Sequence, residues 1–160
     1  MAVSQRLSRN ILPIIDSLVQ FRRLTSTKIL YDGECKLCLA EISILRRLPS
    51  KKTLEFVDIT KEEYKPELYN GITYEDAMKE MHVIANEKVY VKADAIRKMY
   101  DEVGLSWLAN FTRLPKIAPY CDKLYTKFAQ YRLERALNKC DTGSCSLKLK
   151  ALKESLHDKS

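Results

Sequence analysis

The sequence lacks long hydrophobic runs, internal repeats and low-complexity segments. No apolar run approaches the ~18 residues needed to cross a bilayer, so we expect no membrane span. Five cysteines in 160 residues are too few for a disulfide scaffold. They fit better with reactive or metal-binding thiols in a reducing compartment.

A dense basic patch with aromatic platforms is also missing, although the net charge is +7. Acidic residues interrupt the basic ones, as in Lys61-Glu62-Glu63, and this mixing argues against nucleic acid as a partner. A hydrophobic content of 46% with 31% charged residues is typical of a soluble globular protein. The length suits one domain with a substantial core.

The first 27 residues differ in composition from the rest of the chain. They contain four arginines, one acidic residue (Asp16) and many serines and threonines, and their apolar residues can form a stripe on a helix. An arginine-rich, acid-poor, amphipathic segment is typical of a mitochondrial transit peptide. We therefore predict a mitochondrial protein with the matrix as its destination. An ordinary surface helix packed on the domain is the alternative interpretation.

Two cysteines follow a short apolar run and a turn. The pattern predicts a buried strand at residues 29–31, a turn at Asp32-Gly33, and a helix that begins at Cys35-Lys36-Leu37-Cys38 and stops at Pro49. Residues i and i+3 are neighbours on a helix, and a helix N-terminus favours a thiolate over a thiol. A redox dithiol is the leading interpretation, with half of a metal site or two structural thiols as alternatives.

The rest of the chain alternates between strand and helix patterns. We expect strands at residues 54–59, 81–84 and 89–91, a short helix capped by Thr73, and helices at 93–103, 105–111 and 120–138. The resulting order is β-α-β-α-β-β-α followed by extra helices. This order is what an α/β, thioredoxin-like three-layer fold requires.

Two of the predicted helices have apolar faces that we expect to be buried. In the helix after the cysteines this face comprises Leu37, Ala40, Ile44 and Leu48, widened by Ile42 and Leu45. In the long helix at 120–138 it comprises Leu124, Phe128, Tyr131 and Arg135, and we expect the tyrosines of this helix to belong to the core or to cap it.

Several segments follow the pattern of one known family. The run Tyr31-Asp32-Gly33-Glu34-Cys35-Lys36-Leu37-Cys38, the second strand at 54–59, the strand at 81–84, the helix start Ala93-Asp94-Ala95 and Tyr131-Arg132 carry this similarity. They resemble the DCC family of predicted thiol-disulfide oxidoreductases, with its Asp-Gly-x-Cys-x-x-Cys signature, over roughly residues 28 to 140. The resemblance implies a thioredoxin-like fold and protein-disulfide reductase activity. One departure from thioredoxins is that Glu80-Met81 stands where they place a cis-proline beside the dithiol.

The motif assigns different roles to its two cysteines. Cys35 lies near the helix N-cap and is the predicted nucleophile, whereas Cys38, one turn in and toward the protein, resolves the mixed disulfide. Lys36 favours the Cys35 thiolate or is simply solvated, and Glu34 opposes it if its side chain points inward. Asp32 either accepts the proton that leaves Cys38 or only forms the turn.

Four further residues are candidates for function. Cys140 and Cys145 enclose a turn after the long helix, and they form a second redox pair, a local disulfide, two free thiols, or a zinc or iron–sulfur site together with the first pair. Cys121 is expected to be a buried apolar residue. His82 lies on a strand beside the first one, where it acts as a base or is merely packed.

These observations divide the chain into a transit peptide at 1–27, a thioredoxin-like domain with its C-terminal helices at 28–139, and a Cys-containing polar tail at 140–160. The leading hypothesis is a thiol-disulfide oxidoreductase that needs no cofactor. Its partners are a disulfide-containing protein or small thiol substrate and an unidentified reductant. The alternatives are a non-enzymatic metal-binding protein that uses Cys35, Cys38, Cys140 and Cys145, and an adaptor that uses only the fold.

Overall fold

A four-stranded mixed sheet forms the centre of the structure. The computed structural model describes residues 26–50, 53–141 and 145–158. The strands are β1 (Ser26–Tyr31), β2 (Thr53–Asp58), β3 (His82–Ala85) and β4 (Lys88–Val91), in the order β2-β1-β3-β4. β2 is parallel to β1, whereas β3 is antiparallel to both β1 and β4. β1 is therefore central, so the residues that follow its carboxyl end lie near the middle of one sheet edge.

The helices alternate with the strands as predicted. They are α2 (Lys36–Leu45), α3 (Tyr74–Lys79), α4 (Lys92–Glu102), α5 (Ser106–Thr112), α6 (Ala118–Asp141) and α7 (Leu147–His157), with a short 3₁₀ turn, η1, at Pro66–Leu68. Thr73 caps α3 as expected, accepting a hydrogen bond from the Asp76 N–H. The order β-α-β-α-β-β-α with further helices confirms the predicted α/β, thioredoxin-like fold.

The two faces of the sheet are covered by different helices, which gives three layers. Successive residues of a strand point to opposite faces. Ile29 and Tyr31 of β1 pack into a cluster with residues of α2 and α4 (Ile42, Leu45, Ala95 and Met99). Leu30 packs on the other side with residues of α3, α6 and α7 (Ala77, Met78, Ala136, Leu149 and Leu152).

Helix α2 turns a different face to the sheet from the one predicted. Cys38, Ile42 and Leu45 are buried, at spacings of four and three residues. Leu37 and Ile44, which were expected inside, leave 56% and 60% of their surface exposed. The prediction was wrong for these two because α2 is apolar on more than one side. Periodicity alone therefore did not determine which side packs.

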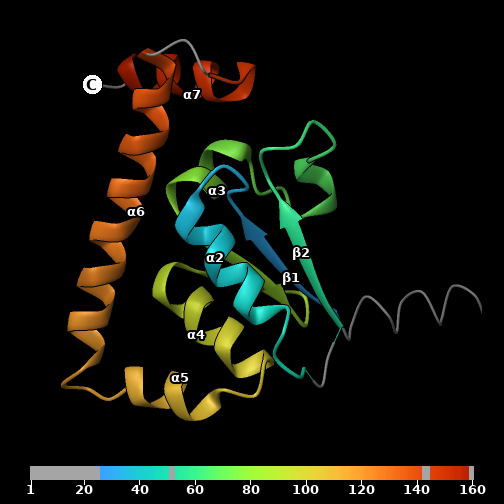
Figure 1. The fold of residues 1–160 in the computed structure, drawn as a ribbon, viewed down its shortest axis with the longest axis vertical. Helices are drawn as coiled ribbons and strands as arrows, with labels where there is room; N and C mark the ends of the chain where they lie inside the picture. Colours follow the sequence, from blue (N-terminus) through green and yellow to red (C-terminus); the bar gives the residue numbers. More distant parts are fainter. Residues whose placement is uncertain (1–25, 51–52, 142–144, 159–160) are drawn as a thin grey trace, which may run out of the picture.

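Helix α6 packs through a narrow face that contains small residues and an arginine. Ala129, Arg132 and Ala136 are buried, and the alanines let the helix approach its neighbours closely. It contacts α3, α4 and α7 and runs along one side of the molecule (Figure 1). The predicted apolar face was wrong here too, since Leu124 and Tyr131 are largely exposed.

Two polar side chains attach α6 to the end of α3 and to the segment that follows it. The guanidinium of Arg132 donates to the carbonyls of Ala77 and Met78, at 3.2 and 2.6 Å, in the last turn of α3. A cation at the carboxyl end of a helix is favourable because the carbonyl dipoles point toward it. The Tyr125 hydroxyl accepts a hydrogen bond from the Met81 N–H at 2.7 Å.

The end of the chain contains a helix that the sequence analysis did not assign. Ser146 caps α7 by accepting from the Leu149 N–H. Leu149 and Leu152 are buried against the sheet face that also receives α3. The region expected to be a polar tail thus contributes to the core. Within the described ranges, no helix is long and apolar enough to span a membrane.

Removal of the Tyr125 hydroxyl, which accepts from the Met81 N–H, should measurably destabilise the protein. Tyr125→Phe should lower the free energy of unfolding by about 1–3 kcal/mol, because a buried backbone N–H loses its acceptor. Urea denaturation measures this loss. Tyr120→Phe is the matched control, since its side chain on the same helix is 73% exposed. Equal stability of the two variants would contradict the proposed importance of this contact.

Candidate functional site

The turn between β1 and α2 places Cys35 at the start of the helix. Asp32 closes the turn, since its carbonyl accepts from the Cys35 N–H and its carboxylate accepts from the Glu34 N–H. Gly33 lies against Asp58 so closely that a Cβ at this position would stand 2.1 Å from the Asp58 carboxylate. The Gly33 N–H donates to that carboxylate at 3.2 Å. A side chain at position 33 would therefore displace either this turn or the Asp58 carboxylate that its N–H contacts.

The two sulfurs of the Cys-x-x-Cys motif face each other. Cys35 is the N-cap of α2, and its sulfur accepts from the Cys38 N–H at 3.2 Å. The Cys38 thiol donates to the same sulfur at 2.6 Å. Cys35 is partly exposed, whereas Cys38 is buried. A molecule that approaches the motif therefore reaches Cys35 first, and the Cys38 sulfur lies behind it at 2.6 Å.

The surroundings separate the pKa values of the two thiols. Hydrogen bonding from the Cys38 thiol lowers the pKa of Cys35 to about 6, with a further contribution from the Cys38 backbone N–H; burial and the charge of Asp32 act in the opposite direction. The same hydrogen bond, together with burial, strongly raises the pKa of Cys38. Near neutral pH this arrangement holds a thiolate at Cys35 and a proton on Cys38.

Asp32 is buried beside the dithiol. Burial raises the pKa of its carboxyl group, while the hydrogen bond from the Glu34 N–H and the charge of Arg132 partly offset this effect. Asp32 is close enough for its charge to act on the pKa of both cysteines. Asp32 therefore forms the turn, and its charge acts on both thiols.

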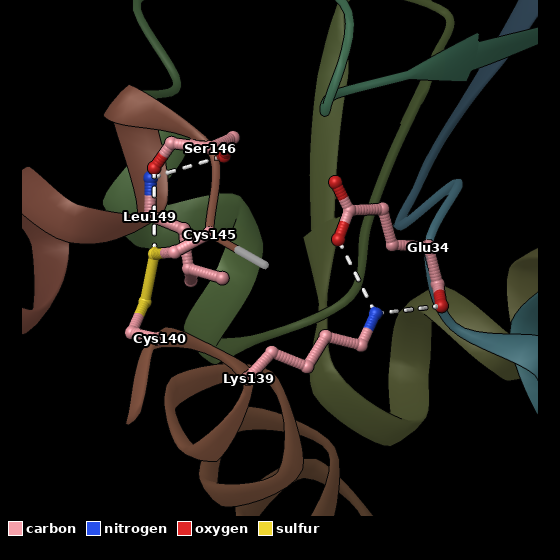
Figure 2. The surroundings of a disulfide bond; sticks show 6 residues. All are labelled: Glu34, Lys139, Cys140, Cys145, Ser146 and Leu149. Atoms are coloured by element: carbon pink, nitrogen blue, oxygen red, sulfur yellow. Dashed lines mark hydrogen bonds and ion pairs between the residues drawn. A yellow bond between two sulfur atoms is a disulfide. The ribbon is translucent and has the colours of Figure 1, made fainter. Parts of the chain in front are cut away.

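Glu34 does not face the thiolate unopposed. Lys139 of α6 donates to its carboxylate at 3.2 Å and to its carbonyl at 3.4 Å, as Figure 2 shows. The pair carries opposite charges, so much of the repulsion expected from Glu34 is compensated. Lys36, next to Cys35 in the sequence, lines a cavity together with Glu34 and Cys35.

Helix α6 forms the far wall of a cavity that opens at Cys35. The cavity has a volume of about 80 Å³, and α6 contributes Phe128, Tyr131, Arg132, Arg135, Ala136 and Lys139 to its lining. Phe128, Arg132, Arg135 and Lys139 are spaced by four, three and four residues, which places them on one side of a helix. The basic residues of this stripe were not among those predicted for the site, although their spacing places them on one side of the helix.

His82 does not join this cavity. It is buried on β3, opposite Leu30 of β1, and its ring nitrogen lies 3.0 Å from the Glu80 carbonyl. Burial lowers the pKa of its ring, although the Glu80 carbonyl and nearby carboxylates act in the opposite direction. His82 is thus a packed strand residue and is absent from the residues that line the cavity.

The remaining cysteines have separate positions. Cys140 and Cys145 form a disulfide that joins the end of α6 to the segment before α7 (Figure 2). Cys121 is half-buried and lines a second cavity, which shares Leu37 and Phe128 with the first. In the described part of the chain, no cluster of three or more His, Cys, Asp or Glu side chains suits a metal ion. The alternative of a four-cysteine metal site therefore has no support in the geometry.

Comparisons with known proteins agree with this chemistry. A family model described as DCC1-like thiol-disulfide oxidoreductase matches residues 29–136. An uncharacterized chloroplastic protein of Arabidopsis thaliana is 38% identical over 109 residues. That match covers 67% of this chain and 51% of the relative, so the chain spans about half of the relative's length. No solved structure matches the chain.

The chloroplastic relative contradicts the predicted mitochondrial location. That prediction depended on the composition of residues 1–27, most of which lie outside the described residues. Transit peptides of mitochondria and chloroplasts are both amphipathic, arginine-rich, serine-rich and poor in acidic residues. Composition therefore cannot separate the two destinations, and the mitochondrial assignment was wrong.

The hydrogen bonds to Cys35 predict the pH dependence of its alkylation. The rate of reaction with iodoacetamide should rise with pH around a midpoint near 6, well below the ~8.5 of an unperturbed cysteine. Cys38→Ala should move this midpoint upward, because it removes the thiol donor. Mass spectrometry of the Cys35 peptide provides the measurement, and Cys121→Ser should leave the midpoint unchanged. A midpoint near 8.5 in the unaltered protein would contradict the geometry.

Proposed function

The chain belongs to the DCC1-like thiol-disulfide oxidoreductase family, and we propose that it reduces disulfides by exchange through Cys35 and Cys38. The observation that carries the proposal is the pair of hydrogen bonds from the Cys38 N–H and thiol to the Cys35 sulfur. Both bonds favour the anionic form of the exposed sulfur, which is the form that attacks a disulfide.

The first step forms a mixed disulfide. The Cys35 thiolate attacks one sulfur of the substrate disulfide, and the substrate S–S bond breaks as the bond to Cys35 forms. The other substrate sulfur leaves with the electron pair and takes a proton from solvent. Cys35 is the attacking residue because it is the more exposed of the pair and has the lower pKa.

The second step releases the substrate. Cys38 loses its proton, its sulfur attacks Cys35, and the second substrate sulfur leaves as a thiolate. Because burial raises the pKa of Cys38, loss of this proton is helped by a nearby base, and Asp32 supplies it in our proposal. The departing thiolate then takes up a proton, and Asp32 gives the proton from Cys38 back to solvent. The substrate thus gains two electrons and two protons, and the protein keeps a Cys35–Cys38 disulfide.

The cycle closes through an external dithiol, which reduces the Cys35–Cys38 disulfide by the reverse exchange and becomes oxidised itself. The substrate is a disulfide-containing protein or an oxidised small thiol. Apart from proton transfers, every bond in the cycle is made or broken between sulfur atoms, so the proposed reaction requires no cofactor.

Replacement of the resolving cysteine tests the proposal. Cys38→Ser should accumulate a stable mixed disulfide at Cys35, because its hydroxyl cannot displace the substrate sulfur. The experiment uses oxidised glutathione or a disulfide-containing protein as the probe, and the adduct is identified by its mass. Cys35→Ser should form no adduct at this motif, and Cys121→Ser should behave as the unaltered protein. Absence of an adduct at Cys35 with every disulfide tried would overturn the proposal.

The role of Asp32 is tested by a substitution that keeps the turn. In Asp32→Asn the amide oxygen can still accept from the Glu34 N–H, but the group no longer takes a proton. We expect release of the second thiol to slow by about 10²-fold. Formation of the mixed disulfide should not slow, because Asp32 opposes the Cys35 thiolate. Rapid-mixing kinetics separates the two steps, and equal slowing of both would refute the assignment of Asp32 as the base.

A further inference from the structure

The cavity at Cys35 has an excess of positive charge. Four of its lining side chains are cations, namely Lys36, Arg132, Arg135 and Lys139. Two are carboxylic acids, Asp32 and Glu34. Even if both acids are ionised and Cys35 is a thiolate, the lining therefore carries a net charge of one positive unit. Once Cys35 is joined to a substrate sulfur, its negative charge is gone and the excess becomes larger.

The acids of the cavity do not neutralise all of these cations. Glu34 is engaged by Lys139 at 3.2 Å. Asp32 accepts from the Glu34 backbone N–H. Neither acid makes an ion pair with Arg135 in the described part of the chain.

Arg132 contributes a cation that water does not screen. Its side chain is buried, with 5% of the residue surface exposed. Its hydrogen bonds go to the neutral carbonyls of Ala77 and Met78, and its buried Nε has no partner among the described residues. Since the field of a poorly solvated charge extends further than that of a solvated one, Arg132 favours negative charge in the adjoining cavity.

Arg135 is the cation placed to touch a ligand. It is exposed on α6, one turn from Arg132, and its recorded hydrogen bond is to the neutral Tyr131 hydroxyl at 3.2 Å. A guanidinium binds a carboxylate through two parallel hydrogen bonds. Arg135 has this capacity available beside Cys35.

The structure also limits how a substrate is held on the other side of the dithiol. The Met81 N–H, in the segment that precedes β3, already donates to Tyr125. Recognition by backbone pairing at this position would require that bond to break. The side chains that line the cavity, most of them from α6, remain available for recognition next to Cys35.

We infer that the α6 wall of the cavity is an anion subsite, and that the substrates of Cys35 are disulfides bearing a carboxylate close to the reacting sulfur. Acidic thiol peptides and protein disulfides flanked by Asp or Glu belong to this class. Arg135 binds the carboxylate while Cys35 attacks the disulfide. The inference rests on the proposed exchange function and adds the substrate class to it.

Three small disulfides of similar length but different charge test the inference. Dithiodipropionate carries two carboxylates, hydroxyethyl disulfide is neutral, and cystamine carries two ammonium groups. The rate of mixed-disulfide formation in Cys38→Ser is measured for each and divided by its rate with free mercaptoethanol, which corrects for intrinsic reactivity. We expect the order dithiodipropionate, hydroxyethyl disulfide, cystamine, and a difference between the extremes that shrinks as salt is added.

Substitution of Arg135 locates the effect. Arg135→Gln should lower the normalised rate with dithiodipropionate about fivefold relative to the rate with hydroxyethyl disulfide. Arg135→Lys should restore part of the preference, because it keeps the charge but loses the paired geometry. Arg47→Gln is the matched control. Arg47 is an exposed arginine beyond the far end of α2, and its substitution removes the same charge as Arg135→Gln.

The outcomes separate this inference from the proposed function. Equal normalised rates for the three disulfides, or equal effects of Arg135→Gln and Arg47→Gln, would overturn the anion subsite while leaving the exchange reaction intact. Failure of Cys35 to react with any of the three would overturn the proposed function itself. The size of an ion-pair contribution depends on how exposed the pair is, so a fall of more than fivefold in the dithiodipropionate rate of Arg135→Gln would also support the subsite.

Discussion

The sulfur of Cys35 takes the place of a helix-capping oxygen, and the rest of the site depends on this contact. The first N–H groups of a helix have no partner within the helix, and the Cys38 N–H finds one in the Cys35 sulfur. A thiolate accepts hydrogen bonds better than a thiol, so the start of α2 and the reactive anion stabilise each other. The same turn brings the Cys38 sulfur to 2.6 Å from the Cys35 sulfur and leaves Cys35 as the more exposed of the two cysteines. Gly33 makes this turn sterically accessible, since Asp58 fills the space of a side chain.

Helix α6 converts this local motif into an enclosed site. Arg132 attaches it to the last turn of α3, and Tyr125 attaches it to Met81, just before β3. The buried Arg132 thereby stabilises the fold. As a poorly solvated cation, it also acts to lower the pKa of Asp32 and of Cys38. Lys139, at the end of the same helix, engages Glu34, and the residue after it is linked to Cys145 by a disulfide. Packing and electrostatics of the site thus depend on one helix far along the chain from the cysteines.

The local structure could be predicted from the sequence, but the faces through which helices pack against distant segments could not. The strand, the Asp32-Gly33 turn and the helix start follow from short-range preferences, and these determine where both cysteines lie. The packing faces of α2 and α6 were wrong, because Leu37, Ile44 and Leu124 repeat at helical spacing yet remain exposed. On α6 small alanines and Arg132 pack instead, which a hydrophobic pattern does not reveal. The α7 helix was missed because its buried side consists of only a few leucines among many lysines. The pairing of Cys140 with Cys145 was one of several alternatives that spacing alone left open.

The central claim is that Cys35 and Cys38 exchange two electrons as one unit, and equilibration in redox buffers tests it most directly. The protein is incubated at graded ratios of reduced to oxidised dithiothreitol, quenched by alkylation, and mapped by mass spectrometry. The account predicts one transition in which Cys35 and Cys38 lose their alkylation together and appear as a linked peptide, while Cys121 stays alkylated. Independent titration of the two thiols, or a dithiol that remains fully reduced at every ratio and in oxidised glutathione, would contradict it.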